Sequence, residues 1–305
     1  MPFAAILLPL VAQVGPFSAN PGAARSTPVE QGVRRPAKPA PWSLVQPAAQ
    51  SGRGQECLAQ VDEDADDAVD VAQAWLANGA KSPAEQAEAQ LCLGLAQSRL
   101  EDWSAAETAF LASRDASGAD RQRRARLGAM AGDAALAAGA NERALAALDA
   151  ARADAAGLSD PALTVPIALD RARALVALKR PDEAAAALAE ARAAAPDNPE
   201  AWLLSATLSR RQGNLAEAQA QIVRAAELAP IDPAVGLEAG VIAMLAGREE
   251  PARKSWASVV AAAPDSPEAE TAKGYLAQLP PAPPSSAATV PRPSPSPPAA
   301  SGVRP

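Results

Sequence analysis

Apolar residues recur at helical spacing through the middle of the chain, where proline and glycine interrupt them at intervals. In residues 197–230 these interruptions predict two helices, because Pro199 suits a first helical position and Gly213 suits a tight turn. Asn214 and Glu217 have the spacing of a capping box, so we expect the second helix to begin there. The segment is therefore predicted to fold as a helical hairpin.

The prolines and glycines that interrupt the apolar pattern recur at a fixed interval. Pro196, Pro230 and Pro264 follow one another at steps of 34 residues. The same step links small residues and turn glycines: Ala184, Ala218 and Ala252; Gly213 and Gly247; and Ala172, Ala206, Gly240 and Gly274. One hairpin of two helices cannot bury its apolar face alone, so the period predicts hairpins that stack on one another.

The order of residue types within one period is also characteristic. An aromatic residue, three small residues, an apolar residue, alanine and proline follow one another at Trp202, Ala206, Gly213, Ala218, Ile222, Ala225 and Pro230. This order resembles the tetratricopeptide repeat family. Further copies lie upstream around Gly132 and Gly94, at offsets of 40 and 38 residues, and Lys179 stands where the family has a turn glycine.

The resemblance covers residues 54–278 and implies an all-α fold. That fold is a right-handed superhelical solenoid of stacked antiparallel helix hairpins, the TPR architecture. We expect about five repeats, a degenerate first copy near residues 55–79, and a capping helix at residues 267–278. The resemblance also implies a bacterial protein whose partner is another protein or a peptide.

Both ends of the chain differ from this body. Residues 1–19 contain an apolar run that is too short to span a membrane but suits a signal peptide. No Lys or Arg precedes the run, so a misplaced start or an apolar tail is the alternative. Residues 20–53 predict a disordered linker and residues 279–305 a disordered proline-rich tail. We expect a periplasmic or secreted protein, with a cytoplasmic one as the alternative.

The composition removes most classes of enzyme. The sequence has no histidine, which excludes Ser-His-Asp and Cys-His catalytic groups and most zinc and haem sites. It has no glycine-rich phosphate loop and no nucleophile-elbow motif. The acidic stretch at residues 62–67 lacks the glycine and the distal glutamate of a calcium loop. We therefore expect no enzyme activity, no cofactor and no metal.

Charge is distributed unevenly. Residues 1–53 carry five Lys or Arg against one Glu, and residues 279–305 carry two Arg. Since the whole chain has a net charge of −7, these +4 and +2 ends leave −13 for residues 54–278. An acidic body is unsuited to phosphate backbones, so we expect no nucleic-acid partner.

Two cysteines, Cys57 and Cys92, lie 35 residues apart, which is almost one period. They are expected on the first helices of neighbouring hairpins, side by side. In an exported protein they would form a disulfide. In a reducing cytosol they would be two small buried thiols, which is the alternative.

The resemblance implies a concave groove lined by the first helix of each hairpin. Carrying the family's groove positions onto this sequence gives Leu169, Arg173, Leu203, Thr207, Arg210, Arg211, Leu237, Val241, Met244 and Tyr275. Leucines flanked by arginines favour a partner segment with hydrophobic anchors and some acidic character. The alternative for the leucines and Met244 is ordinary packing between repeats.

Three functions fit these features. The first is a non-enzymatic adaptor that holds a peptide or partner segment in the groove and serves assembly or maintenance of the cell envelope. The second is a regulatory or substrate-presenting subunit of an enzyme complex. The third is a structural spacer without a groove ligand. The fold alone does not select among them, because one fold serves many roles.

Overall fold

The computed structural model describes residues 51–280. The expected signal peptide, residues 20–50 of the expected linker and residues 281–305 of the expected tail lie outside the described residues. The sequence predicts a linker that ends at residue 53, but a helix already begins at Gly52, because the Ser51 side chain caps it by accepting a hydrogen bond from the Gly54 N–H. Within residues 51–280 the chain forms thirteen α-helices and no strand. They are α2 (Gly52–Glu63), α3 (Ala65–Asn78), α4 (Pro83–Arg99), α5 (Trp103–Ala116), α6 (Arg121–Ala137), α7 (Asn141–Ala155), α8 (Pro161–Ala177), α9 (Pro181–Ala194), α10 (Pro199–Arg211), α11 (Leu215–Leu228), α12 (Pro233–Leu245), α13 (Glu249–Ala262) and α14 (Pro267–Gln278).

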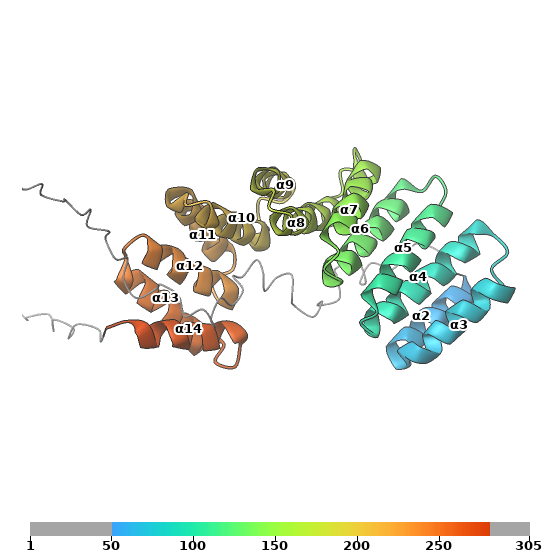
Figure 1. Ribbon diagram of the computed structural model, residues 1–305, viewed down its shortest axis with the longest axis horizontal. Coiled ribbons are helices and arrows are strands. Elements are labelled where there is room, and N and C mark those ends of the chain that lie inside the picture. Colours follow the sequence, from blue (N-terminus) through green and yellow to red (C-terminus); the bar gives the residue numbers. More distant parts are fainter. Residues whose placement is uncertain (1–50, 281–305) are drawn as a thin grey trace, which may run out of the picture.

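The helices form antiparallel hairpins that stack in chain order, with α2 and α14 at opposite ends of an elongated array (Figure 1). We call α2, α4, α6, α8, α10, α12 and α14 the first helices and the others the second helices. Each second helix packs against its own first helix and against the next one along the chain. First helices also contact one another, as in the pairs α6 with α8 and α12 with α14. The predicted all-α solenoid is confirmed.

On the first helices α4, α6 and α12, a glycine makes room for a large side chain sixteen positions later. A Cβ added at Gly132 would lie 2.5 Å from Leu148, and one at Gly240 would lie 2.1 Å from the indole of Trp256. The same spacing and crowding relate Gly94 to Phe110. The hairpin can close only when this position is small, which explains why the sequence repeats a small residue there.

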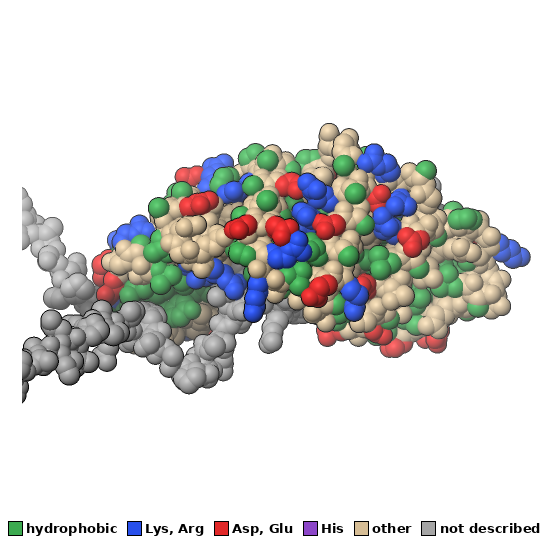
Figure 2. Space-filling model, turned by 45° about the horizontal axis from the view of Figure 1, so that its top comes forward, with side chains coloured by type: hydrophobic (Ala, Val, Ile, Leu, Met, Phe, Trp, Pro, Cys, Tyr) green, Lys and Arg blue, Asp and Glu red, His purple; other side chains and the backbone are tan. Residues whose placement is uncertain are grey.

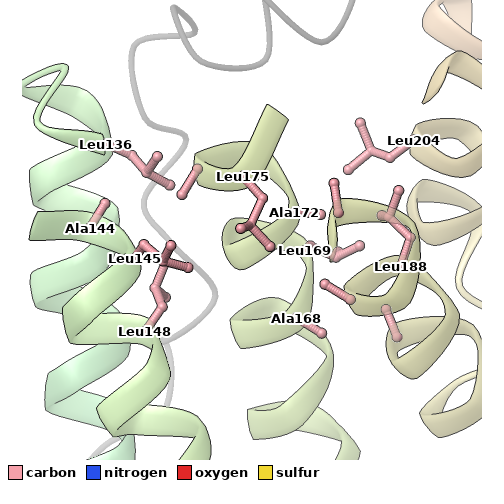
Figure 3. Packing of buried hydrophobic residues seen from close by; sticks show 14 of the residues in the cluster. Leu136, Ala144, Leu145, Leu148, Ala168, Leu169, Ala172, Leu175, Leu188 and Leu204 are labelled. Carbon is pink, nitrogen blue, oxygen red and sulfur yellow. The ribbon is translucent and has the colours of Figure 1, made fainter. Parts of the chain in front are cut away.

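The core is continuous from one hairpin to the next. Around α8, leucines from α6, α7, α9 and α10 surround the buried side chains of Leu169 and Leu175 (Figure 3). Leu175 is 1% exposed and Leu188 of α9 is 2% exposed. Because each hairpin buries apolar surface against its neighbours, the array depends on stacking for its stability.

The helix starts follow the expected capping chemistry in part. Ser82 and Glu85 form a complete capping box at the start of α4. Asn214 precedes α11 but makes no side-chain capping bond. Glu217 instead accepts a hydrogen bond from Gln221 Nε2 at 2.8 Å. The capping box predicted for Asn214 and Glu217 is therefore wrong, because Glu217 bonds along its own helix.

The turns inside the hairpins need a left-handed backbone. Gly139, Gly213 and Gly247 have φ values of 72°, 82° and 72°. Lys179 occupies the corresponding turn between α8 and α9 with φ of 59°. Glycine adopts this region freely, whereas a side chain is strained there by about 1 kcal/mol. The turn therefore forms at Lys179 although a lysine backbone disfavours a positive φ.

The first hairpin is tied to the array by covalent and polar contacts. A disulfide joins Cys57 of α2 to Cys92 of α4, with 6.1 Å between the Cα atoms and both residues fully buried. The Ser51 backbone N–H donates to the Glu88 carboxylate at 3.2 Å, and Arg99 Nη2 bonds Asp62 at 2.5 Å. These contacts fix α2 beside α4.

Candidate functional site

Three of the ten residues predicted to line the groove lie inside the protein. Leu169 and Leu237 are each 3% exposed, and Thr207 is fully buried. Leu169 belongs to the core around α8 (Figure 3), and the Thr207 hydroxyl donates to the Leu203 carbonyl at 3.0 Å. These three residues pack repeat against repeat, so their prediction as groove residues is corrected. A period gives a residue's place in the repeat but not the depth of its side chain.

The other apolar residues predicted to line the groove are partly exposed, and they lie on three neighbouring first helices. Leu203 lies on α10, Val241 and Met244 on α12, and Tyr275 on α14, where its ring lies 4.9 Å from that of Trp256. Leu245, which the sequence did not single out, is 56% exposed beside Met244. Since α12 contacts both α10 and α14, we name Leu203, Val241, Met244, Leu245 and Tyr275 the apolar strip.

Two of the predicted groove arginines are bound within the protein. Arg173 Nη1 donates to Asp170 at 2.5 Å, and its Nη2 donates to Glu200 of α10. Arg210 Nε donates to Glu238 of α12 at 2.6 Å, and Glu238 is fully buried. Both arginines connect one first helix to the next. These two arginines are therefore neutralised by carboxylates within the protein.

Arg211 follows at the end of α10 and is exposed. It lies at the edge of a shallow recess between α8, α9 and α10, together with Ala172, Val176 and Leu204. The recess is mostly apolar and adjoins Arg173.

Asp133 of α6, which was not among the predicted groove residues, lies near Asp170 and Arg173 of α8. It lies 40 residues before Arg173, which is the offset between the matching small residues Gly132 and Ala172. Asp133 and Arg173 thus hold the same position in successive repeats, and this offset was the available signal. Asp133 makes no hydrogen bond or ion pair with any residue in the described part of the chain.

The electrostatic environment of Asp133 is unfavourable to its charge. Burial and the nearby Asp170 carboxylate raise the pKa of Asp133 to about 7, and Arg173 only partly opposes them. Burial also raises the pKa of Asp170, against the attraction of Arg173. We name Asp133, Asp170 and Arg173 the Asp133 cluster, which contains two carboxylates and one guanidinium.

Elsewhere on the surface the charges compensate one another. Figure 2 shows Lys or Arg and Asp or Glu side chains interspersed on one face rather than gathered by sign. Arg121 Nη2 donates to the Ala156 carbonyl at 2.8 Å, and Arg124 Nε bonds Asp154 at 3.2 Å. The basic run at residues 121–126 therefore serves contacts with α7 as well as solvation.

The sequence of residues 165–208 matches a family model described as tetratricopeptide repeat. The match spans most of α8, all of α9 and most of α10, where Arg173 and Glu200 join the two repeats. This segment belongs to the tetratricopeptide repeat family, and residues 51–280 have the tetratricopeptide repeat fold. Proteins built from these repeats are generally non-catalytic interaction scaffolds, and their fold implies protein or peptide partners.

Solved tetratricopeptide repeat structures resemble this chain over most of their own length. PilF of Pseudomonas aeruginosa is 14% identical with a TM-score of 0.56, and the alignment covers 73% of this chain and 96% of PilF. PilW, a widely conserved type IV pilus biogenesis factor, is 17% identical with a TM-score of 0.57 and coverages of 73% and 99%. MamA of Desulfovibrio magneticus RS-1 is 16% identical with a TM-score of 0.51 and coverages of 59% and 98%. No curated protein sequence matches the chain significantly.

Among residues 51–280, no group of three or more His, Cys, Asp or Glu side chains is placed so that it could hold a metal ion. No helix in that range combines the length and the apolar character needed to cross a bilayer. The features that remain for function are the apolar strip and the Asp133 cluster. Both lie on the first helices of the tetratricopeptide repeats.

Proposed function

We propose that this protein is a non-enzymatic adaptor that holds a segment of a partner protein on its first helices. The observation that carries the proposal is the apolar strip. Leu245 exposes 56% of its surface, and Val241, Met244 and Tyr275 lie partly exposed beside it. Aliphatic and aromatic side chains grouped on one face of a scaffold are typical of a protein interface.

We further propose that the adaptor works in the periplasm or outside the cell and serves the cell envelope. The apolar run within residues 1–19 supports export. The disulfide between Cys57 and Cys92 supports an oxidising compartment, because such bonds persist mainly there. PilW, a protein of the same fold, is a type IV pilus biogenesis factor, so the fold is compatible with envelope assembly.

The compartment is tested by the intact mass of the protein from separated cell fractions, with and without reductant and alkylating agent. We expect a species that lacks its first residues and whose cysteines react only after reduction. A full-length cytosolic protein with two reactive thiols would contradict the envelope proposal.

The adaptor role is tested by isolating the tagged full-length protein with its bound partners. Leu245→Glu places a charge on the apolar strip and should remove the partner. The matched control is Val223→Glu on the second helix α11, where Val223 is 46% exposed. Equal recovery of partners by both variants would contradict the role of the strip. A catalytic polypeptide among the partners would indicate a regulatory subunit, and a protein with no partner would indicate a spacer.

A further inference from the structure

A recess lies between the start of α4 and the turn that joins α5 to α6. Its volume is about 400 Å³, and its walls include Ser82, Ala84, Ala87, Asp120 and Arg123. Binding sites for small molecules have volumes of about 300–1,000 Å³, so this recess is at the lower end of that range. It therefore suits a small molecule or the end of a chain rather than a long segment.

Arg123 of α6 contributes the one positive charge among the residues that line the recess. Its Nε and Nη2 atoms are buried, and neither makes a hydrogen bond with any residue of 51–280. The arginines beside it are paired, since Arg121 donates to the Ala156 carbonyl and Arg124 to Asp154. Buried donors without an acceptor are unfavourable and rare, so the unpaired nitrogens of Arg123 require an explanation.

The two unpaired nitrogens lie on the same edge of the guanidinium. Their N–H groups are parallel, and such an edge matches the two oxygens of a carboxylate or the oxygens of a phosphate. The Asp120 carboxylate is engaged elsewhere, because it caps α6 by accepting a hydrogen bond from the Arg123 backbone N–H at 2.9 Å. Arg123 therefore keeps a complete pair of donors for an acceptor from outside the described repeats.

The other residues of the recess select among anions. The negative charge of Asp120 repels a dianion such as phosphate more strongly than a carboxylate with one charge. Much of the remaining lining consists of the alkyl groups of Pro83, Ala84 and Ala87. A carboxylate joined to a small apolar group fits both features.

We propose that this recess binds a carboxylate carried on a small apolar body, and that the Nε and Nη2 atoms of Arg123 hold its two oxygens. The recess belongs to α4, α5 and α6, whereas the apolar strip belongs to α10, α12 and α14. The inference therefore goes beyond the proposed function and does not depend on it.

The binding is tested with isovalerate as the probe and the full-length protein labelled with ¹⁵N. The arginine Nε–H signals are followed by NMR, and the signal of Arg123 is assigned by its loss in Arg123→Lys. We expect isovalerate to shift this signal saturably and the uncharged isovaleramide to leave it unchanged. Acetate should bind about tenfold more weakly, because it lacks most of the apolar body. Inorganic phosphate that binds more tightly than isovalerate would overturn the choice of ligand.

Three variants separate the paired donors from simple charge. The backbone amides of Ser117 and Gly118, which line the recess, report binding when Arg123 is replaced. Arg123→Lys keeps the charge but not the two parallel donors, and it should weaken isovalerate binding about tenfold. The matched control, Lys81→Met, removes an exposed charge next to Ser82 and should change the affinity less than twofold. Ala84→Leu fills the recess and should abolish binding while leaving Arg123 in place.

A second probe, N-acetylglycylvaline, distinguishes the source of the carboxylate. Tighter binding of isovalerate would assign the recess to a free organic acid, and tighter binding of the peptide would assign it to the carboxyl end of a protein chain. No saturable shift with either acid, or equal affinities in the wild type and Arg123→Lys, would overturn the inference. Neither result would affect the adaptor role of the apolar strip.

Discussion

Removing the disulfide between Cys57 and Cys92 should loosen the first hairpin and leave the rest of the array unchanged. The two cysteines are 35 residues apart and fully buried between α2 and α4. We consider the double variant Cys57→Ala/Cys92→Ala, which removes the bond while keeping small apolar side chains. The closed segment contains α3, so the bond restricts the entire first hairpin when it opens.

The size of the effect follows from the length of the closed loop. Closing about 35 residues contributes about 4 kcal/mol through the lost entropy of the open chain. Because repeats contact only their neighbours, this loss should stay within α2 and α3. A change of 4 kcal/mol corresponds to about 10³ in an opening equilibrium.

Hydrogen exchange of the native protein, read peptide by peptide by mass spectrometry, measures this directly. Amides of α2 and α3 should exchange up to about 10³ times faster in the variant, while those of α12 and α13 should not change. Unchanged exchange in α2 and α3 would refute the stabilising role of the bond. Equal acceleration throughout would refute the local character of the repeats.

Three further variants test the energetics of the repeats by chemical denaturation. Asp133 holds a proton in the folded protein up to about pH 7, whereas an unfolded aspartate loses it near pH 4. The free energy of unfolding of the wild type should therefore fall as the pH rises from 4 to 7. At pH 7 the Asp133→Asn variant should be more stable than the wild type by up to about 4 kcal/mol. Parallel pH profiles of the two proteins would contradict this. Lys179→Gly should stabilise by about 1 kcal/mol by relieving the φ of 59°, and a destabilised variant would refute the strain. Arg210→Met should lower the free energy of unfolding by about 3–5 kcal/mol, because it leaves the buried Glu238 unpaired. Adding Glu238→Met should recover most of this loss. A double variant no more stable than the single variant would contradict this.

The hairpins could be predicted from the sequence because their physics is local and repeated. Three kinds of residue each have one structural use and recur at a fixed interval. They are the turn glycine, such as Gly213, the proline that opens a helix, such as Pro199, and the small residue at the helix crossing, such as Gly240. Where the interval was kept, the helices begin and end close to the expected positions. The left-handed Lys179 shows that the turn forms even without its preferred residue.

The depth and partners of side chains could not be predicted in the same way. Leu169 and Leu203 hold the same repeat position, yet the former is buried and the latter is partly exposed. The pairs Arg173 with Glu200 and Arg210 with Glu238 span 27 and 28 residues, which is not a multiple of the period. Such contacts depend on how the repeats stack in space.

Site-specific photo-crosslinking in living cells would show whether the first helices hold a partner segment. A photoreactive residue at Leu245 on the apolar strip is compared with one at Val223 on the second helix α11, which is 46% exposed. We predict one partner crosslinked through position 245 and absent from position 223. A partner crosslinked at position 223, with none at position 245, would contradict the account.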